Sequence, residues 1–171
     1  GSHLDTQPTG GKYDGILGVL GGLEILRTLN DLGIKTKHPI VVTNWTNEEG
    51  TRYAPAMLSS GVFAGIHTED WAKSRVDADG KAFGDELKRI GWQGDEPVGA
   101  RKMHAFFELH IEQGPILEAE GKDIGVVTHG QGLSWTQVTI TGKESHTGST
   151  PMPMRKKSLF KFGKIPLLPP F

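Results

Sequence analysis

The chain has 171 residues, a formal net charge of −1, 36% hydrophobic residues and 23% charged residues, which is typical of a globular protein of about one domain. The absence of cysteine excludes a disulfide scaffold, a thiolate metal site and a thiol nucleophile. No apolar run approaches the ~18 residues of a membrane span and no signal-peptide pattern opens the chain, so we expect a cytoplasmic protein without membrane contact.

The first predicted element is a helix over 15–32, where apolar residues recur at helical spacing. Asp14 stands where an N-cap residue would, and Gly33 stands where a C-terminal glycine would. The apolar stripe is wide, which predicts a well-buried helix, and the glycines within it permit close packing on a sheet.

Continuous apolar runs predict buried strands at 39–45, 105–111 and 124–128. Short helices are expected between and around these runs, over 53–59, 69–73, 82–90 and 115–120. Residues 134–141 instead alternate between two unlike faces, which indicates a different sheet and a domain junction near 130–134. This order of elements predicts an α/β fold with a largely parallel sheet.

Several polar residues are expected at the carboxyl edge of this sheet, where open α/β sheets bind ligands. They are His3 with Asp5, Asp14, the adjacent pair Glu48 and Glu49, and His110. Histidine, aspartate and glutamate side chains that converge there would form a nitrogen and oxygen site suited to Zn²⁺ or Mn²⁺. Because adjacent side chains diverge, one glutamate could bind the metal while the other accepts a proton from the attacking water.

Each of these residues also has a structural interpretation when it is taken alone. A single histidine in a strand is more often a hydrogen-bonded core residue, Asp14 could be only a helix cap, and Glu48 with Glu49 could form a solvated turn. His146 could donate a hydrogen bond to a developing oxyanion or could be an ordinary surface histidine. No basic stripe with interleaved aromatic residues is present over residues 1–154, so we expect no nucleic-acid partner.

Four motifs follow one another in a characteristic order: GSHLDTQPTGGKYDG (1–15), NEEG (47–50), FELHIEQGPILE (107–118) and GKESHTGSTPM (142–152). Together they resemble the hydantoinase/carbamoylase branch of the M20 metallohydrolases, which contains N-carbamoyl-L-amino-acid hydrolases, β-ureidopropionases and allantoate amidohydrolases. The resemblance implies a three-layer α/β sandwich, with part of the metal-binding catalytic domain over 1–133. The first strand and loop of an α+β lid and dimerisation domain would follow over 134–155.

The resemblance also implies a site for two divalent metal ions, Zn²⁺ or Mn²⁺, with Co²⁺ and Ni²⁺ as alternatives. His3 and His110 would bind one ion, and Asp14 would bridge the two. Glu49 would bind the second ion. Asp5 would not bind metal itself but would orient the ring of the ligand His3.

In the same comparison Glu48 would be the general base, Gln113 would lie on the substrate side, and His146 would reach the active site across a homodimer. Hydroxide bridging the two ions would attack the carbamoyl carbon of a small N-carbamoyl or ureido acid and release ammonia, carbon dioxide and an amino acid. Allantoate hydrolysis is an alternative. An M20 peptidase is a less favoured one, because such peptidases usually carry an acidic ligand where His110 stands.

The family pattern stops after Met154 and Arg155. Residues 155–171 carry five basic residues and no acid, which leaves a net charge of −6 on 1–154. We expect 156–171 to be a tail outside the family, disordered or translated out of frame. The family's C-terminal histidine ligand and the substrate-binding arginine and asparagine of the lid have no counterpart after His146. We therefore expect negligible turnover by this chain alone, and an inactive remnant with a partial metal site is a further alternative.

Overall fold

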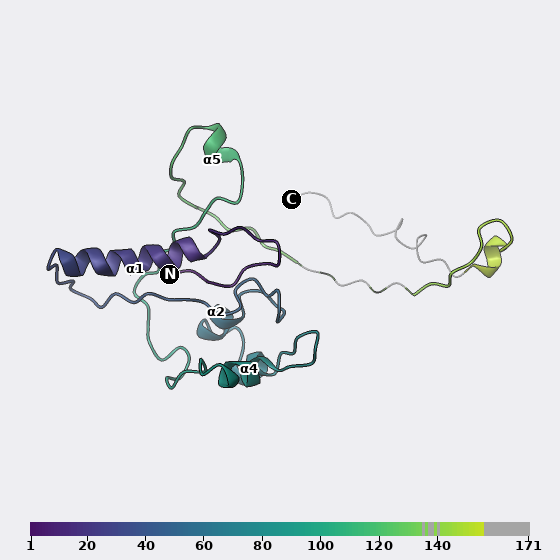
Figure 1. Ribbon diagram of the computed structural model, residues 1–171, viewed down its shortest axis with the longest axis horizontal. Coiled ribbons are helices and arrows are strands. Elements are labelled where there is room, and N and C mark those ends of the chain that lie inside the picture. Colours follow the sequence, from purple (N-terminus) through teal and green to yellow (C-terminus); the bar gives the residue numbers. More distant parts are fainter. Residues whose placement is uncertain (135, 137–138, 140, 156–171) are drawn as a thin grey trace. The chain divides into compact units, whose positions relative to one another are not determined.

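The computed structural model describes residues 1–134, 136, 139 and 141–155. The chain divides into two compact units, Gly1–Ile124 and Gly125–Phe171. The first contains α1 (Ile16–Asp31), α2 (Leu58–Phe63), α3 (Glu69–Lys73), α4 (Phe83–Arg89) and α5 (Ile116–Ala119), and the second contains the 3₁₀ helix η1 (Met152–Met154) (Figure 1). Among these residues, no helix is both long enough and apolar enough to cross a membrane. The boundaries predicted at 133 and 155 remain predictions, and the predicted tail lies outside the described residues.

Helix α1 confirms the helix predicted over 15–32. Gly15, and not Asp14, takes the N-cap position, and no side chain caps the helix there. Gly33 follows the helix with a φ of +64°, the left-handed conformation expected of a C-terminal glycine.

The packing of α1 differs from the expected one. The helix buries Gly18, whereas Leu20 is 53% exposed, so the prediction of a well-buried helix was wrong for this structure. The predicted close approach is present, because a Cβ atom on Gly18 would lie only 2.5 Å from the carbonyl oxygen of Leu109. A glycine at this position lets the helix lie directly on the neighbouring extended segment.

The short helices α3, α4 and α5 occur where the sequence predicts them, with ends shifted by at most one residue. Helix α3 is capped by Thr68, whose hydroxyl accepts a hydrogen bond from the Trp71 N–H at 3.2 Å. Helices α4 and α5 end before glycines with positive φ, Gly91 at +71° and Gly121 at +60°. The ends of these helices can be predicted from the sequence because they depend on nearby capping side chains and glycines.

Helix α2 was predicted at 53–59, before Gly61, but it spans Leu58–Phe63 and includes that glycine. The reason is a side chain–backbone contact that holds the preceding residues as a loop. The Asn47 amide donates to the Tyr53 carbonyl at 2.7 Å, and its oxygen accepts from the Tyr53 N–H at 3.3 Å. Because this backbone is already paired with a side chain, it is not available for helical hydrogen bonds.

Three extended segments meet beside the start of α1. Ser2 forms an isolated parallel bridge with Asn44, and the Gly1 amino group donates to the Phe107 carbonyl at 3.0 Å on the other side. Residues 1–3 therefore lie between the other two segments. The carboxyl-terminal ends of the three segments lie close together, as expected at the carboxyl edge of a parallel sheet.

The strands predicted at 39–45, 105–111 and 124–128 are absent as regular strands from the part of the chain that the structure describes. Their apolar side chains are also exposed and not buried, at 61% for Val41, 83% for Phe107 and 88% for Val127. In the described ranges the predicted helices are thus present, and the predicted parallel pairing is seen only as the bridge between Ser2 and Asn44.

The predicted strand over 134–141 falls in part on residues 135, 137, 138 and 140, which lie outside the described residues.

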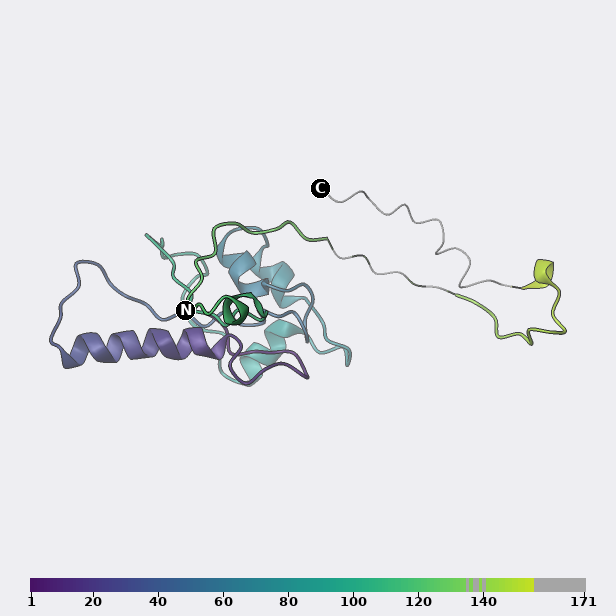
Figure 2. The ribbon, with the colours of Figure 1, turned by 90° about the horizontal axis from the view of Figure 1, so that it is seen from above.

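A small core forms where α2, α3 and α4 meet, helices that Figure 2 shows gathered together. Tyr53, Leu58, Ala72 and Phe83 are buried in it, and the Tyr53 ring packs edge-on against the Phe83 ring with centroids 5.1 Å apart. Tyr53 is also the residue whose backbone pairs with Asn47. The core therefore anchors the loop that follows the two adjacent glutamates.

Candidate metal centre

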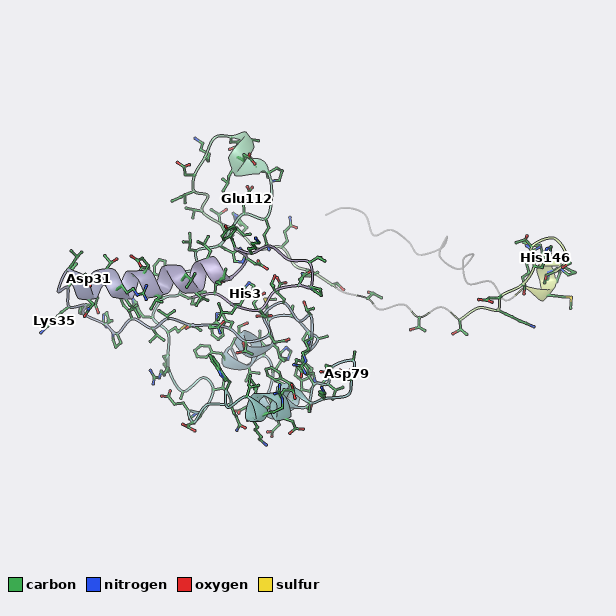
Figure 3. All side chains as sticks on the ribbon, viewed as in Figure 1. His3, Asp31, Lys35, Asp79, Glu112 and His146 are labelled. Carbon is green, nitrogen blue, oxygen red and sulfur yellow. The ribbon has the colours of Figure 1, made fainter. Side chains whose placement is uncertain are left out.

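The structure brings five of the predicted residues together, at the ends of the three extended segments and just before α1. Donor atoms of His3, Asp14 and His110 all lie within 4.8 Å of one another, and so do donor atoms of His3, Glu48 and Glu49. His3 is therefore common to both groups, and Figure 3 shows it in the interior of the first unit. The expectation that these side chains meet at one edge agrees with this geometry.

The two histidines present their rings to each other. The ring centroids of His3 and His110 are 5.8 Å apart, with 27° between the planes. In each ring Nδ1 faces a backbone carbonyl, of Asp5 at 2.7 Å for His3 and of Ile111 at 2.9 Å for His110. We assign the proton to Nδ1 from these partners, which leaves the lone pair on Nε2, as in metal-binding histidines.

Asp14 lies between the histidines and is 5% exposed. Its Oδ1 is 3.6 Å from His110 Nε2 and accepts a hydrogen bond from Gln113 at 2.9 Å, while its Oδ2 accepts from Thr6 at 3.0 Å. Burial by itself would raise the pKa of Asp14, but hydrogen bonding to Glu49 and Thr6 and the charges of the nearby histidines outweigh burial and lower the pKa. Asp14 is thus a buried carboxylate within the site, and its interpretation as only a helix cap is wrong.

Glu48 and Glu49 are held in place through hydrogen bonds of their backbone N–H groups. The Asp5 carboxylate accepts the N–H of Glu48 at 3.1 Å and that of Glu49 at 3.0 Å. The Glu48 carboxylate then lies 3.7 Å from His3 Nε2, and burial raises the pKa of Glu48 above its ordinary value. A raised pKa makes this carboxylate a stronger proton acceptor than an ordinary exposed glutamate.

Asp5 contacts His3 mainly through its own backbone. The carbonyl oxygen of Asp5 lies 2.7 Å from His3 Nδ1, whereas the closest carboxylate oxygen is 3.7 Å away. The carboxylate is instead occupied by the two glutamate amides. Asp5 therefore links the histidine to the glutamate turn.

Gln113 reaches the site from a left-handed backbone conformation, with a φ of +55°. The preceding Glu112 accepts the N–H groups of Ile116 at 3.1 Å and Leu117 at 3.0 Å at the start of α5. This cap fixes the turn that directs the Gln113 amide toward Asp14. In this structure the amide binds a candidate metal ligand directly.

His146 belongs to the second unit. Its Nδ1 accepts the N–H groups of Gly148 and Ser149, both at 3.2 Å, and so stabilises a turn. The structure thus brings together the predicted residues of the first unit, including Gln113, and His146 is described within its own unit.

Sequence reasoning overlooked Thr6 and Gln7. Thr6 donates to Asp14, and Gln7 donates to Glu49 Oε2 at 3.1 Å. Both directly follow the His3–Asp5 motif, but residues in a turn have no fixed periodicity that would assign them to a face. Their polar side chains next to two candidate ligands were the available signal.

The donor set has the chemistry of a divalent metal site. Two imidazole nitrogens and a buried carboxylate are ligands that Zn²⁺ accepts, and nitrogen and oxygen sites also bind Mn²⁺. The pairing of both Nδ1 atoms leaves the two Nε2 atoms for coordination. The described residues therefore fit a metal ion at His3, Asp14 and His110.

Comparison with known proteins yields consistent similarities. The family model "Peptidase family M20/M25/M40" matches residues 1–163. An N-carbamoyl-L-amino-acid amidohydrolase of Rhizobium meliloti is 78% identical over 165 residues, which cover 96% of this chain and 40% of the relative. A ureidoglycolate hydrolase of Arabidopsis thaliana is 38% identical over 164 residues, which cover 91% of this chain and 34% of the relative.

A solved structure of a hydantoinase/carbamoylase family amidase from Burkholderia vietnamiensis is 55% identical, with a TM-score of 0.80. The match covers 95% of this chain and 40% of that one. The chain thus spans about 40% of the length of these bacterial proteins.

Proposed function

Because the chain belongs to peptidase family M20/M25/M40, as its four motifs indicated, we propose that its site is part of a metal-dependent amidohydrolase. It would cleave the linear C–N bond of small N-carbamoyl amino acids, the substrate class in the name of the Rhizobium meliloti relative. The observation that carries this proposal is the convergence of His3, Asp14 and His110 within 4.8 Å. The similarity to a ureidoglycolate hydrolase makes related ureido acids the second candidate substrate.

The site would hold two divalent ions. His3, Asp14 and His110 would bind the first, and Asp14 with Glu49 would contribute to the second. When bound, the ions would polarise the carbamoyl carbonyl and make the attacking water more acidic.

Glu48 would then act as the general base. Burial raises the pKa of Glu48 and makes its carboxylate a better proton acceptor, so it would take a proton from the attacking water and return it to the leaving nitrogen. The 3.7 Å separation from His3 Nε2 puts the Glu48 carboxylate next to the proposed ligands. Asp5 would keep it there through the Glu48 N–H.

Gln113 and His146 would contact the substrate. The Gln113 amide has two N–H donors, one of which already binds Asp14, so the other could orient a substrate oxygen. His146 would stabilise the developing oxyanion from the partner chain of a homodimer. In this proposal 1–133 belong to the catalytic domain, 134–155 begin the lid, and the protein works in the cytoplasm.

A chimera tests the function. Residues 1–155 of this chain would replace the matching region of the Rhizobium meliloti relative, and ammonia release from N-carbamoyl-L-amino acids would be measured with Mn²⁺ or Zn²⁺. We expect an active chimera that Glu48→Gln inactivates and that Glu24→Gln, on an exposed position of α1, leaves unchanged. An inactive chimera beside an active parent would contradict the proposal.

The chain alone is expected to show negligible turnover in the same assay. Rates near those of the chimera would refute that expectation.

A further inference from the structure

We propose that residues 3–7 organise the metal site beyond supplying His3, and that Thr6 is a positioning residue for the Asp14 carboxylate. This inference rests on the proposed metal site. It concerns how the ligands are held, and not which reaction follows.

The side chains of residues 5–7 each contact a part of the site contributed by another segment. Asp5 accepts the N–H groups of Glu48 and Glu49, Thr6 donates to Asp14 Oδ2 at 3.0 Å, and Gln7 donates to Glu49 Oε2 at 3.1 Å. A single turn of chain therefore binds both acidic segments. If these contacts are lost, the acidic ligands are free to move relative to His3.

The Thr6 contact is the most specific of them because Asp14 is nearly completely buried. Thr6 fixes Oδ2, which sets the plane of the carboxylate and leaves Oδ1 facing His110 Nε2 at 3.6 Å. A carboxylate oxygen has two lone pairs, so Oδ2 can accept this hydrogen bond and still bind a metal ion. The Thr6 hydroxyl would thus orient Asp14 without competing with a metal ion.

The position of Gly10 is independent evidence that the turn holds the Thr6 hydroxyl in place. A Cβ atom on Gly10 would overlap Oγ1 of Thr6, and the Gly10 N–H donates to the Gln7 carbonyl at 2.9 Å. The turn at 7–10 therefore closes around the Thr6 hydroxyl and leaves no room for a methyl group. Gly10→Ala should displace this hydroxyl although Thr6 itself is unchanged.

Metal titration of the full 171-residue chain tests the inference. The affinity for Zn²⁺ would be measured by calorimetry, and the visible absorption of bound Co²⁺ would report the coordination geometry. Thr6→Val has the same shape without the donor, and we expect its affinity to fall about 10- to 100-fold with an altered Co²⁺ spectrum. Thr6→Ser keeps the donor and should restore both to within about threefold of wild type.

Gly10→Ala is the second, independent variant and should weaken binding in the same direction as Thr6→Val. Thr36→Val is the matched control, because the Thr36 hydroxyl is exposed and binds only the nearby His38 carbonyl. If Thr6→Val fails to fold, as judged by circular dichroism without metal, Thr6→Ser and Gly10→Ala decide the question.

The outcomes separate the inference from the proposed function. Wild-type affinity and an unchanged Co²⁺ spectrum in both Thr6→Val and Gly10→Ala would overturn the role of Thr6 and leave the metal site intact. If the wild-type chain binds neither ion, the proposed site and this inference both fail.

Discussion

The carboxylate of Asp5 accepts the backbone N–H of Glu49 at 3.0 Å, across 44 positions of sequence. Its other oxygen accepts the N–H of Glu48, so one side chain fixes the peptide group between the two glutamates. With that peptide fixed, the Glu48 carboxylate lies near His3 while Glu49 contacts Asp14. The side chains of Glu48 and Glu49 are therefore held so that they point in different directions.

Removal of the Asp5 carboxylate should loosen this turn. We expect Asp5→Ala to lower the Zn²⁺ affinity of the chain about 10- to 100-fold, and Asp5→Asn, which keeps one acceptor oxygen, to lower it less. Isothermal titration calorimetry measures both, with Asp31→Ala at the exposed end of α1 as the control. Equal affinities for Asp5→Ala and wild type would show that the glutamate turn does not depend on Asp5.

The Asn47 side chain should contribute strongly to stability. Asn47→Ala leaves the backbone N–H and carbonyl of Tyr53 without their partners and puts alanine at a φ of +56°, so we expect a loss of about 2–4 kcal/mol in unfolding free energy. Asn47→Asp tolerates this conformation and keeps the acceptor, so it should cost less. Urea denaturation measures the loss of unfolding free energy in both variants. A loss below about 0.5 kcal/mol for Asn47→Ala would contradict the prediction.

Two glycines of α1 should respond in opposite ways to alanine. A Cβ at Gly18 would meet the Leu109 carbonyl at 2.5 Å, so Gly18→Ala should destabilise the chain by about 1–3 kcal/mol. A Cβ at Gly21 meets only a Leu109 methyl at 3.4 Å, so Gly21→Ala should gain up to about 1 kcal/mol from helix propensity. Thermal unfolding of the two variants provides the comparison, and a shift of the same sign in both would contradict the packing described here.

Glu86 should stabilise the chain in a pH-dependent way. Hydrogen bonds from Arg89 and Arg52 lower the pKa of Glu86 from 4.5 to about 2. Because the folded pKa is the lower one, this stabilisation is complete above pH 4.5 and disappears as the pH falls toward 2. The difference in urea midpoint between wild type and Glu86→Gln should therefore be largest near neutral pH and shrink in that window. A constant difference would argue against it, and Glu24→Gln controls for the loss of one charge.

Helices were predictable from sequence because their limits depend on nearby residues. Gly33, Gly91 and Gly121 end helices, and all three have positive φ. Helix α2 was misplaced because the Asn47–Tyr53 contact is formed between a side chain and a backbone that no periodicity reveals. The predicted strands depended on backbone partners distant in the sequence, which the apolar pattern of one segment does not specify.

The candidate site was predictable to a different extent. The convergence of His3, Glu48 and His110 follows from the rule that parallel segments end at one edge. The hydrogen bonds from Thr6 and Gln7 could not be anticipated, because they depend on the exact path of a turn. The direction of the Gln113 amide, toward Asp14, likewise requires the left-handed backbone at that residue.

The binding of a divalent ion by the 171-residue chain tests the central claim most directly. Metal content after dialysis against Zn²⁺, together with calorimetric titration, should show saturable binding of at least one ion per chain, and His3→Ala with His110→Ala should abolish it. A wild-type chain without bound zinc, or a double variant that binds zinc as tightly as wild type, would contradict the assignment of these residues as metal ligands.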